Sequence, residues 1–320
     1  MKYFIVDDTR VDWRLDKFLT EKTGQTRSQL KKAIESGLVL INDKQAKVHQ
    51  FLRLKDKVTL LTTKSKLQTA KEEEEKEEIN IEVPEPSIIK ETDDYIIINK
   101  PAGLLVHATK SSNELTLVDW LIEKYPELEK IADPVSMTKR DLTFRPGIVH
   151  RLDREVSGIM LIARTQESFE FFKAQFKKRT IKKTYTAIVH GKMELGSGKI
   201  DFEISRSKTT KKMAAHPAGS GKGLTALTEY NVIRNDFKRS LLEINLHTGR
   251  TNQIRVHFNA INHPILGDRL YTQKRNSKNN ETVARLMLHA TKLSFTDQNG
   301  EKQNYQADIP AYFQKIIKLI

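Results

Sequence analysis

Apolar residues near the start of the chain follow helical spacing and then strand-like runs. Residues 15–19 place apolar side chains on one helical face, and Thr26 with Gln29 three residues later has the pattern of a helix-capping box. Short apolar runs at 38–42 and 57–61 then predict strands. This first part of the chain therefore predicts a small unit that combines two helices with a few strands.

The longer second part mixes strand and helix patterns without regular alternation. Apolar runs at 95–99, 159–163 and 184–189 predict strands, and 254–261 predicts a helix. Another helix is expected to place three aromatic side chains in the core rather than on a stacking surface: Phe169, Phe172 and Phe176. Mixed strands and helices without a βαβ order predict an α+β fold.

An acidic segment separates the two parts. Residues 67–91 hold 3 basic and 9 acidic residues, a net −6, and include the run EEEEKEE. A block of like charges repels itself and stays solvated, which favours a flexible tether over a third folded body. We therefore expect a domain at 1–66, an acidic linker at 67–87 and a second domain at 88–320.

The charge of both parts points to a polyanionic partner. The chain carries 55 Lys and Arg against 41 Asp and Glu, a net +14, of which 1–66 contributes +7 and 92–320 contributes +13. Nucleic acid suits this balance, and no membrane partner is expected, since no long apolar run and no signal-like start occur. The absence of cysteine fits the cytoplasm. The nine histidines form no His-x-x-x-His pair, so no metal site is expected.

A polar loop precedes the apolar run at 159–163. Residues 147–158 read GIVHRLDREVSG, and Asp153 stands between Arg151 and Arg154, which we expect to hold its carboxylate ionised and therefore nucleophilic. The alternative is an ordinary solvated turn of ion pairs, because charged loops are common and mostly structural.

Several segments of the second part match a known family in sequence and in order. They are NKPAG at 99–103 with His107, HRLD at 150–153 followed by Ser157 and Gly158, KTYTA at 183–187, GRTNQIRVH at 249–257, GDRLY at 267–271 and LHA at 288–290. From Ile88 onward the chain resembles the RluA/RluC/RluD-type RNA pseudouridine synthases, and the first part resembles the S-four-like RNA-binding domain. The resemblance implies a mixed, mainly antiparallel sheet with flanking helices, joined to a small α/β RNA-binding domain.

The same resemblance implies an activity and its residues. The expected reaction converts specific uridines to pseudouridine, most naturally in large-subunit (23S) ribosomal RNA, by a monomer that needs no cofactor. Asp153 would be the catalytic carboxylate, Tyr185 would stack on the target base, and Arg255 would pair with the carboxylate. Arg151 would fill the gap that an extruded base leaves. Further RNA contacts are expected from His150, Arg250, Arg27, Lys31 and Lys32.

Two positions depart from the family pattern, and two other functions stay open. Val156 stands where threonine is usual, and Asn252 stands where histidine is usual. A non-catalytic RNA-binding or ribosome-assembly protein could use the same fold. A glycosidase-like hydrolase would need a second carboxylate near Asp153, and Glu155 is the only near candidate.

Overall fold

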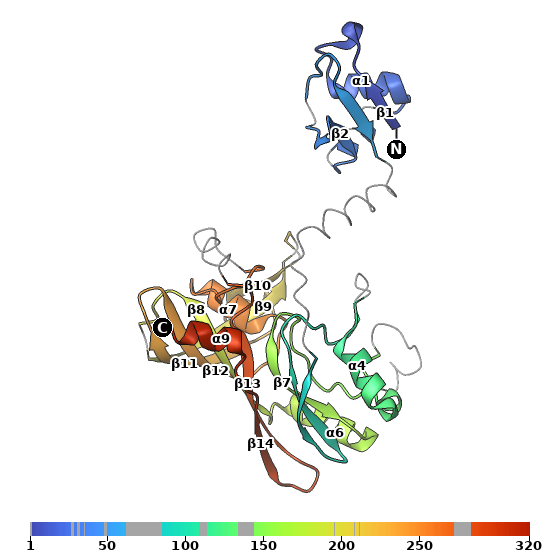
Figure 1. Ribbon diagram of the computed structural model, residues 1–320. Coiled ribbons are helices and arrows are strands. Elements are labelled where there is room, and N and C mark those ends of the chain that lie inside the picture. Colours follow the sequence, from blue (N-terminus) through green and yellow to red (C-terminus); the bar gives the residue numbers. More distant parts are fainter. Residues whose placement is uncertain are drawn as a thin grey trace. The chain divides into compact units, whose positions relative to one another are not determined.

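The computed structural model describes residues 2–26, 29–30, 33–34, 36–47, 50–61, 85–108, 114–133, 144–194, 196–207, 209–210, 212–271 and 283–320. The chain divides into two compact units, Met1–Glu82 and Val83–Ile320 (Figure 1). Each unit has a hydrophobic core of its own. The predicted linker at 67–87 lies almost entirely outside the described residues.

The smaller unit packs α1 against a four-stranded antiparallel sheet of strand order β1-β4-β2-β3. Its elements are β1 (Lys2–Ile5), the 3-10 helix η1 (Asp8–Arg10), α1 (Leu15–Thr23), β2 (Val39–Ile41), β3 (Lys44–Gln45) and β4 (Lys57–Leu60). The predicted first helix is confirmed, with Leu15, Phe18 and Leu19 fully buried. The capping box is also present, because the backbone N–H of Thr26 donates to Gln29 Oε1 at 2.9 Å and that of Gln29 to Thr26 Oγ1 at 3.3 Å.

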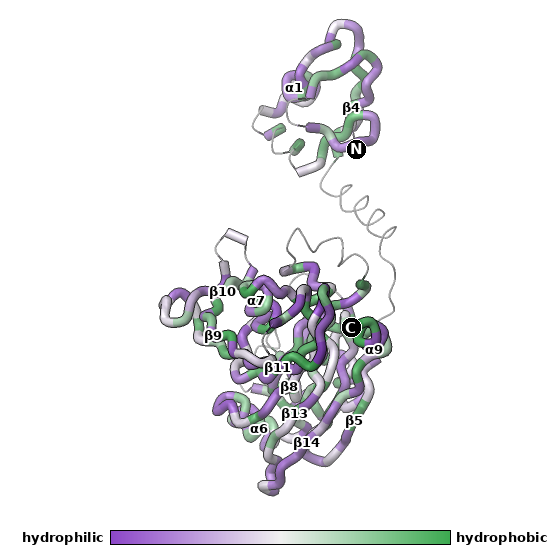
Figure 2. Tube along the Cα trace, turned by 90° about the vertical axis from the view of Figure 1, so that its left-hand side faces the viewer, coloured by the Kyte–Doolittle hydropathy of each residue, from purple (hydrophilic) through white to green (hydrophobic). Residues whose placement is uncertain are grey.

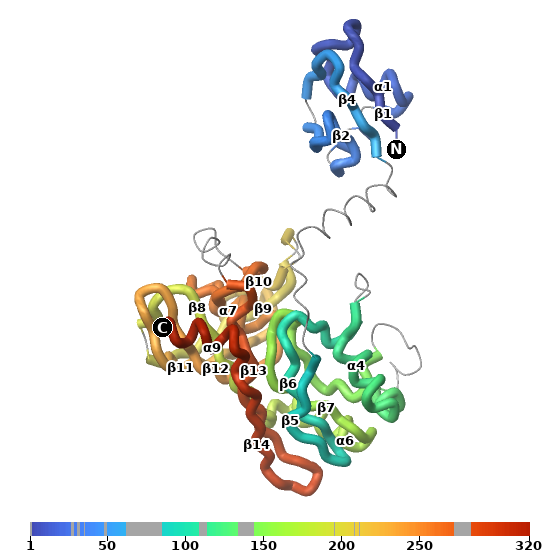
Figure 3. The backbone as a smooth tube through the Cα atoms, viewed as in Figure 1, coloured from blue at the N-terminus to red at the C-terminus, as the bar shows by residue number. Residues whose placement is uncertain are grey.

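The larger unit is built on one long sheet with the strand order β10-β9-β11-β12-β8-β13-β7-β6-β5, and β14 pairs with β13 (Figure 3). The strands are β5 (Ser87–Glu91), β6 (Tyr95–Lys100), β7 (Ser157–Ala163), β8 (Lys182–His190), β9 (Ser197–Arg206), β10 (Met213–Pro217), β11 (Leu227–Asn235), β12 (Arg239–Leu246), β13 (Leu288–Thr296) and β14 (Lys302–Gln306). The helices are α4 (Leu117–Lys124), η2 (Pro126–Lys130), α6 (Gln166–Lys178), α7 (Gln253–Ala260) and α9 (Ala311–Ile317).

Two halves of this sheet meet where β7 lies parallel to β13, the one parallel pairing among the described strands. Gly158 makes this pairing possible: it has φ +123°, and a Cβ there would lie 2.2 Å from the backbone oxygen of Ala290. Helices α4 and α6 lie beside the half formed by β5, β6 and β7, and α7 packs on β9, β10 and β11 (Figure 1). Every residue of β7 is buried, whereas the turn at the tip of the β13–β14 hairpin is hydrophilic (Figure 2).

The predicted α+β class and mainly antiparallel sheet are confirmed. The apolar runs at 95–99, 159–163 and 184–189 became β6, β7 and β8. The sequence reading missed β9, β10, β14 and α9, because their half-exposed residues give no continuous apolar run. One core prediction needs correction: Phe169 and Phe172 are buried, but Phe176 is only partly buried and faces a cavity described below.

Candidate active site

The loop between Gly147 and Ser157 is fastened to β7 by backbone and side-chain bonds. The carbonyl oxygen of Gly147 accepts a hydrogen bond from the N–H of Ala163 at 2.9 Å. Glycine is required here because φ is +68° and because the backbone of Ala163 would lie too close to a Cβ. His150 Nε2 accepts from the N–H of Leu161 at 2.9 Å, and its ring stacks on Phe176 with centroids 4.5 Å apart. Burial, and after it the charge of Lys183, lowers the pKa of His150 to about 3, so the ring stays neutral.

Lys100 holds the loop from the side of the protein core. Its ammonium donates to the carbonyl oxygens of Pro101, Leu104 and Arg154 at 2.9, 2.9 and 3.1 Å, and the residue has no exposed surface. Burial lowers the pKa of Lys100 to about 7, against the opposing effect of Glu155 and Asp153. Three acceptors match the three N–H groups of a protonated amine, so this buried cation is fully hydrogen-bonded. The side chain of Lys100 therefore joins the NKPAG segment to Arg154, the residue that follows HRLD.

The loop presents Asp153, whose side chain is 23% exposed, to Arg255 and Asn252. Arg255 Nη1 lies 3.6 Å from Asp153 Oδ2. In the orientation of the Asn252 amide that satisfies its neighbours, the amide nitrogen donates to Asp153 Oδ2 at 2.7 Å. The arginines that flank Asp153 in sequence form other contacts: Arg154 pairs with Glu114 at 2.9 Å, and Arg151 is exposed. The expectation that these two arginines hold the carboxylate is corrected, because neighbours along a turn point in different directions.

A short chain of hydrogen bonds continues from Asn252 to the sheet. The Tyr271 hydroxyl donates to the Asn252 amide oxygen at 3.1 Å, and it accepts from the backbone N–H of Met213 on β10, also at 3.1 Å. Asn252 has φ 54° and ψ 24°, a left-handed conformation that asparagine tolerates well. The position that departs from the family pattern is thus a direct hydrogen-bond donor to Asp153.

Arg255 has a stronger partner than Asp153. Its Nε and Nη2 donate to the two carboxylate oxygens of Asp268 at 2.7 and 2.9 Å, and the Asp268 side chain has no exposed surface. Burial alone would lower the pKa of Arg255, but the carboxylates of Asp268 and Asp153 raise it. Asp268 thereby fixes the guanidinium so that its remaining nitrogen faces Asp153. Sequence reasoning matched the GDRLY segment that contains Asp268 but gave the residue no role.

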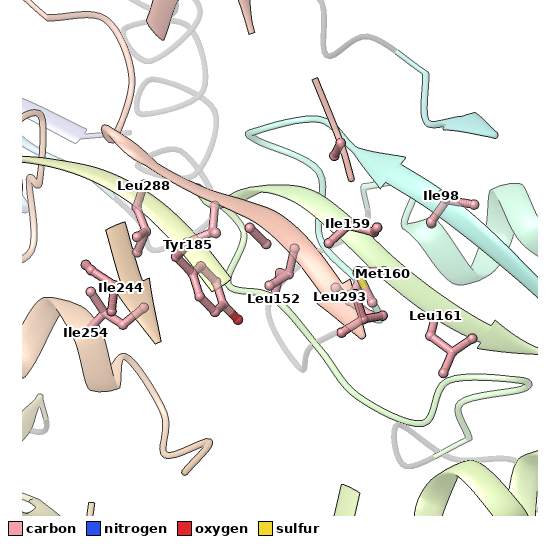
Figure 4. Close-up of a cluster of buried hydrophobic side chains, with 14 of the residues drawn as sticks. Ile98, Leu152, Ile159, Met160, Leu161, Tyr185, Ile244, Ile254, Leu288 and Leu293 are labelled. Carbon is pink, nitrogen blue, oxygen red and sulfur yellow. The ribbon is translucent and has the colours of Figure 1, made fainter. Parts of the chain in front are cut away.

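Tyr185 comes from β8 and contributes an aromatic ring to the same site. The ring lies between Leu152 on one side and Ile244 and Ile254 on the other (Figure 4). Burial, and after it the charge of Asp153, raises the pKa of Tyr185 above its usual range. The phenol therefore stays protonated near neutral pH, which suits stacking and hydrogen-bond donation.

These side chains line one cavity of about 430 Å³. The wall includes every site residue predicted for the larger unit: Asp153, Tyr185, Arg255, Arg151, His150 and Arg250. It also includes cations that sequence reasoning did not select: Lys177, Arg179 and Lys183. Among the described residues that line the cavity, Asp153 is the one that is acidic. The cavity is therefore large enough for a nucleotide base and sugar, and it is strongly basic around a single carboxylate.

The other residues that the sequence singled out have different surroundings. His150 lines the cavity, but its Nε2 is occupied by the backbone of β7. Arg250 is half-buried, and its Nε donates to the carbonyl of Thr225 at 3.1 Å. Arg27, Lys31 and Lys32 lie outside the described residues. Val156 is buried, and its N–H donates to the carbonyl of Asp153 at 3.1 Å, so the valine packs under the loop.

The site offers one carboxylate for chemistry, held by a cation and an amide, beside a protonated phenol. A carboxylate so placed can act as a nucleophile or a base toward a sugar. In the ranges that the structure covers, no group of three His, Asp or Glu side chains is arranged to hold a metal ion. Within the same ranges, no helix is long and apolar enough to cross a membrane.

Comparison with known proteins gives consistent matches to both units. Residues 94–260 match the RNA pseudouridylate synthase family, and residues 13–58 match the S4 domain. A protein of Neisseria meningitidis serogroup A named ribosomal large subunit pseudouridine synthase D is 36% identical over 313 residues, which cover 94% of this chain and 76% of that protein. An RNA pseudouridine synthase of Aquifex aeolicus without further characterisation is 34% identical, covering 95% of this chain and 92% of that protein.

Solved structures give a fold-level match. The human RNA pseudouridylate synthase domain containing 1 aligns with a TM-score of 0.57 at 23% identity, covering 71% of this chain and 84% of the human chain. The human RNA pseudouridylate synthase domain containing 4 aligns with a TM-score of 0.56 at 24% identity, covering 72% and 92%. At these identities the likeness concerns the fold alone.

Proposed function

Because the chain belongs to the RNA pseudouridylate synthase family and is an isomerase that acts on RNA, we propose that it converts uridines of large-subunit ribosomal RNA to pseudouridine. The observation that carries this choice of RNA is the 36% identity to a ribosomal large subunit pseudouridine synthase D along 94% of the chain, the S4 segment included. We propose further that the protein works as a monomer in the cytoplasm.

Asp153 would perform the central step. The isomerisation breaks the bond between N1 of uracil and C1′ of the ribose and forms a bond between C5 and C1′. The C5 proton is lost and N1 gains one, so no redox partner is required. An anionic Asp153 could attack C1′ or remove the neighbouring C2′ proton. Both uses need an ionised carboxylate, which the hydrogen bond from Asn252 and the ion pair with Arg255 support.

Tyr185 and Arg151 would handle the base. The raised pKa of Tyr185 supports a protonated ring that stacks on the uracil. Arg151 is exposed at the cavity wall two residues before Asp153, where it could occupy the space that an extruded base vacates. Arg151→Ala would then slow modification of a uridine in a folded stem-loop more than that of a uridine in an unstructured oligonucleotide. Equal slowing of both in single-turnover assays would assign the arginine to the chemistry or to the loop.

We propose domain boundaries at 1–66 and 88–320, with the acidic linker 67–87 between them. The N-terminal domain would bind RNA through a basic surface, in keeping with its S4 match and its net charge of +7.

Pseudouridine mapping of ribosomal RNA tests the proposal. In cells that lack the gene, one or more large-subunit pseudouridines should disappear, and they should return when the wild-type gene is restored. The matched control is a gene that encodes Asp153→Asn, which keeps the fold but should restore none. If ribosomal RNA is unchanged, the substrate is another RNA. If Asp153→Asn restores ribosome assembly as well as the wild type, the non-catalytic role gains the support.

A further inference from the structure

Lys183 is a cavity-facing cation for which the proposed chemistry has no use. It lies two residues before Tyr185 on β8, and alternate residues of a strand project from the same face. Both side chains line the cavity. Across the described part of the chain, the side chain of Lys183 forms neither a hydrogen bond nor an ion pair, although its backbone pairs with β13. Its ammonium thus faces the cavity with its donors available.

The surroundings make this free charge unfavourable in the absence of a ligand. Burial, and after it the nearby charge of Arg179, lowers the pKa of Lys183. Asp153, the acidic residue of the lining, is already held by Asn252 and Arg255. A partly buried cation without a counter-ion is costly, and an anion that entered the cavity would remove that cost.

Opposite the amine, the backbone leaves space for such an anion. Among the described residues, a Cβ built on Gly249 would meet one atom within 4 Å, the Lys183 Nζ at 3.8 Å. The turn that carries Gly249 is held in place because Gln253 Oε1 accepts from the Thr248 hydroxyl at 2.7 Å and from the Arg250 N–H at 3.0 Å. The fold therefore tolerates a side chain at Gly249, yet glycine keeps the space beside the amine open.

We propose that Lys183 and the Gly249 turn form a subsite for one phosphodiester of the RNA strand, adjacent to the nucleotide that enters the cavity. The proposal rests on RNA as the substrate and adds which part of the RNA this wall recognises. A compact ammonium suits a phosphate oxygen as a point charge, and the neighbouring Arg179 adds to the attraction. Because a phosphate carries no sequence information, the subsite positions the strand rather than selecting the uridine.

Salt-dependent binding separates this subsite from a general basic surface. Full-length protein is titrated with a single-stranded RNA at several salt concentrations. Lys183→Met should weaken binding about 10-fold and reduce the salt slope by about 0.7, the value for one phosphate contact on a single strand. Lys183→Arg should retain most of the slope. The matched control is Lys182→Met, since Lys182 is exposed and faces the other side of β8; its slope should equal that of the wild type.

Gly249→Ala tests the space itself without changing any charge. The added methyl group contacts no backbone atom of the described residues, and Gly249 has no positive φ. The thermal midpoint should therefore stay unchanged while RNA affinity falls several-fold. If the variant binds RNA as tightly as the wild type, no phosphate occupies that space. If Lys183→Met lowers kcat but leaves affinity and salt slope unchanged, Lys183 acts in the chemistry and the subsite is refuted.

Neutral methylphosphonate linkages identify the phosphate. Placed one at a time around the modified uridine, a single linkage should weaken wild-type binding and have no further effect in Lys183→Met, which is the signature of one shared contact. If every position weakens both proteins equally, the proposal fails. The salt titration does not depend on which RNA is modified in the cell. Its result can therefore still be interpreted if ribosomal RNA is not the substrate.

Discussion

Lys100 and Lys183 are two lysines whose pKa is lowered by burial, and they contact very different surroundings. Lys100 donates all three of its N–H groups to backbone carbonyls and joins the 100–104 turn to the Asp153 loop. The side chain of Lys183 has no hydrogen bond or ion pair with the described residues and faces the cavity. Burial and a shifted pKa are common to both, so neither identifies a functional residue. The difference lies in the groups that the two side chains contact. It separates a loop anchor, made of Lys100, His150 and Gly147, from a cavity wall that includes Asp153, Asn252, Arg255, Tyr185 and Lys183.

Replacing Asp153 should produce the largest effect, confined to the cavity wall. Asp153→Asn keeps the shape of the side chain but removes the anion, so isomerisation should fall by at least ~10³-fold. RNA affinity and the thermal midpoint should change little, because binding relies on many Lys and Arg contacts. Tritium release from RNA labelled at C5 of uridine measures the activity beside a filter-binding titration. Substantial release by a well-folded variant would remove Asp153 from the centre of the mechanism.

Replacing Asp268 should destabilise the fold around the cavity wall, because Asp268 holds Arg255 in place. Asp268→Asn leaves the buried guanidinium of Arg255 without its bidentate partner, which should cost about 3–5 kcal/mol in the free energy of unfolding. Urea denaturation of the larger unit measures the loss. The control is Glu114→Gln, whose pair with Arg154 is about half exposed on both sides and should contribute less than ~1 kcal/mol. Similar losses for the two variants would contradict the special place of Asp268.

Replacing Lys100 tests the loop anchor. Lys100→Met fills similar volume but leaves buried carbonyl oxygens without donors, so the free energy of unfolding should fall by about 3 kcal/mol. Remaining folded protein should bind RNA with an unchanged salt slope, in contrast to Lys183→Met. Lys90→Met, at an exposed position of β5, serves as the control for removal of one charge. A changed slope in Lys100→Met would mean that the anchor also contacts RNA.

Acid should weaken the anchor through His150. The pKa of His150 is lowered to about 3 in the folded protein, whereas an unfolded histidine titrates near ~6.5. Below pH ~6.5 the histidine of the unfolded chain binds a proton, whereas His150 in the folded chain does not. The free energy of unfolding that is present at pH 7 therefore declines as the pH falls from about 6.5 toward 3. For one group the decline is up to ~1.4 kcal/mol per pH unit. His150→Gln should reduce this slope by that amount in denaturation series between pH 7 and 5. An unaltered slope would show that His150 titrates normally.

Changing Asn252 should have the smallest effect on kcat, together with a distinctive pH dependence. Asn252→His places a titratable ring beside Asp153, in place of an amide that has the same charge at every pH. We expect kcat to change by only a few-fold, about 1 kcal/mol, but to become dependent on pH between 5.5 and 7.5, where the wild-type rate should be flatter. The ratio of the two kcat values across that range is the measurement. Parallel profiles would mean that Asn252 does not influence the carboxylate.

The sequence predicted the fold best where the signal is local or strongly periodic. The apolar run that became β7 and the Thr26–Gln29 capping box depend on a few neighbouring residues. The strands β9, β10 and β14 were missed because their alternate residues are only half-buried, at places set by tertiary pairing.

The site was predictable as a set of residues but not as a set of contacts. Resemblance selected Asp153, Tyr185 and Arg255, which line one cavity, but no pattern indicated that Asp268 holds Arg255 or that Asn252 reaches Asp153. The expectation for Arg151 and Arg154 failed because proximity in sequence does not fix the direction of a side chain in a turn. Contacts between residues far apart in the chain depend on the finished fold, and sequence spacing does not encode them.

The hydrogen-bond chain from Met213 to Asp153 has a polarity. A backbone N–H can only donate, so the Met213 amide obliges the Tyr271 hydroxyl to turn its proton toward the Asn252 oxygen, which turns the Asn252 N–H₂ toward Asp153. If the Tyr271 hydroxyl or the Asn252 amide turned the other way, two hydrogen-bond donors would face each other. The Asp153 carboxylate therefore always faces the N–H₂ group of Asn252 and never its amide oxygen. The backbone of β10 sets this orientation for a loop some sixty residues away in sequence.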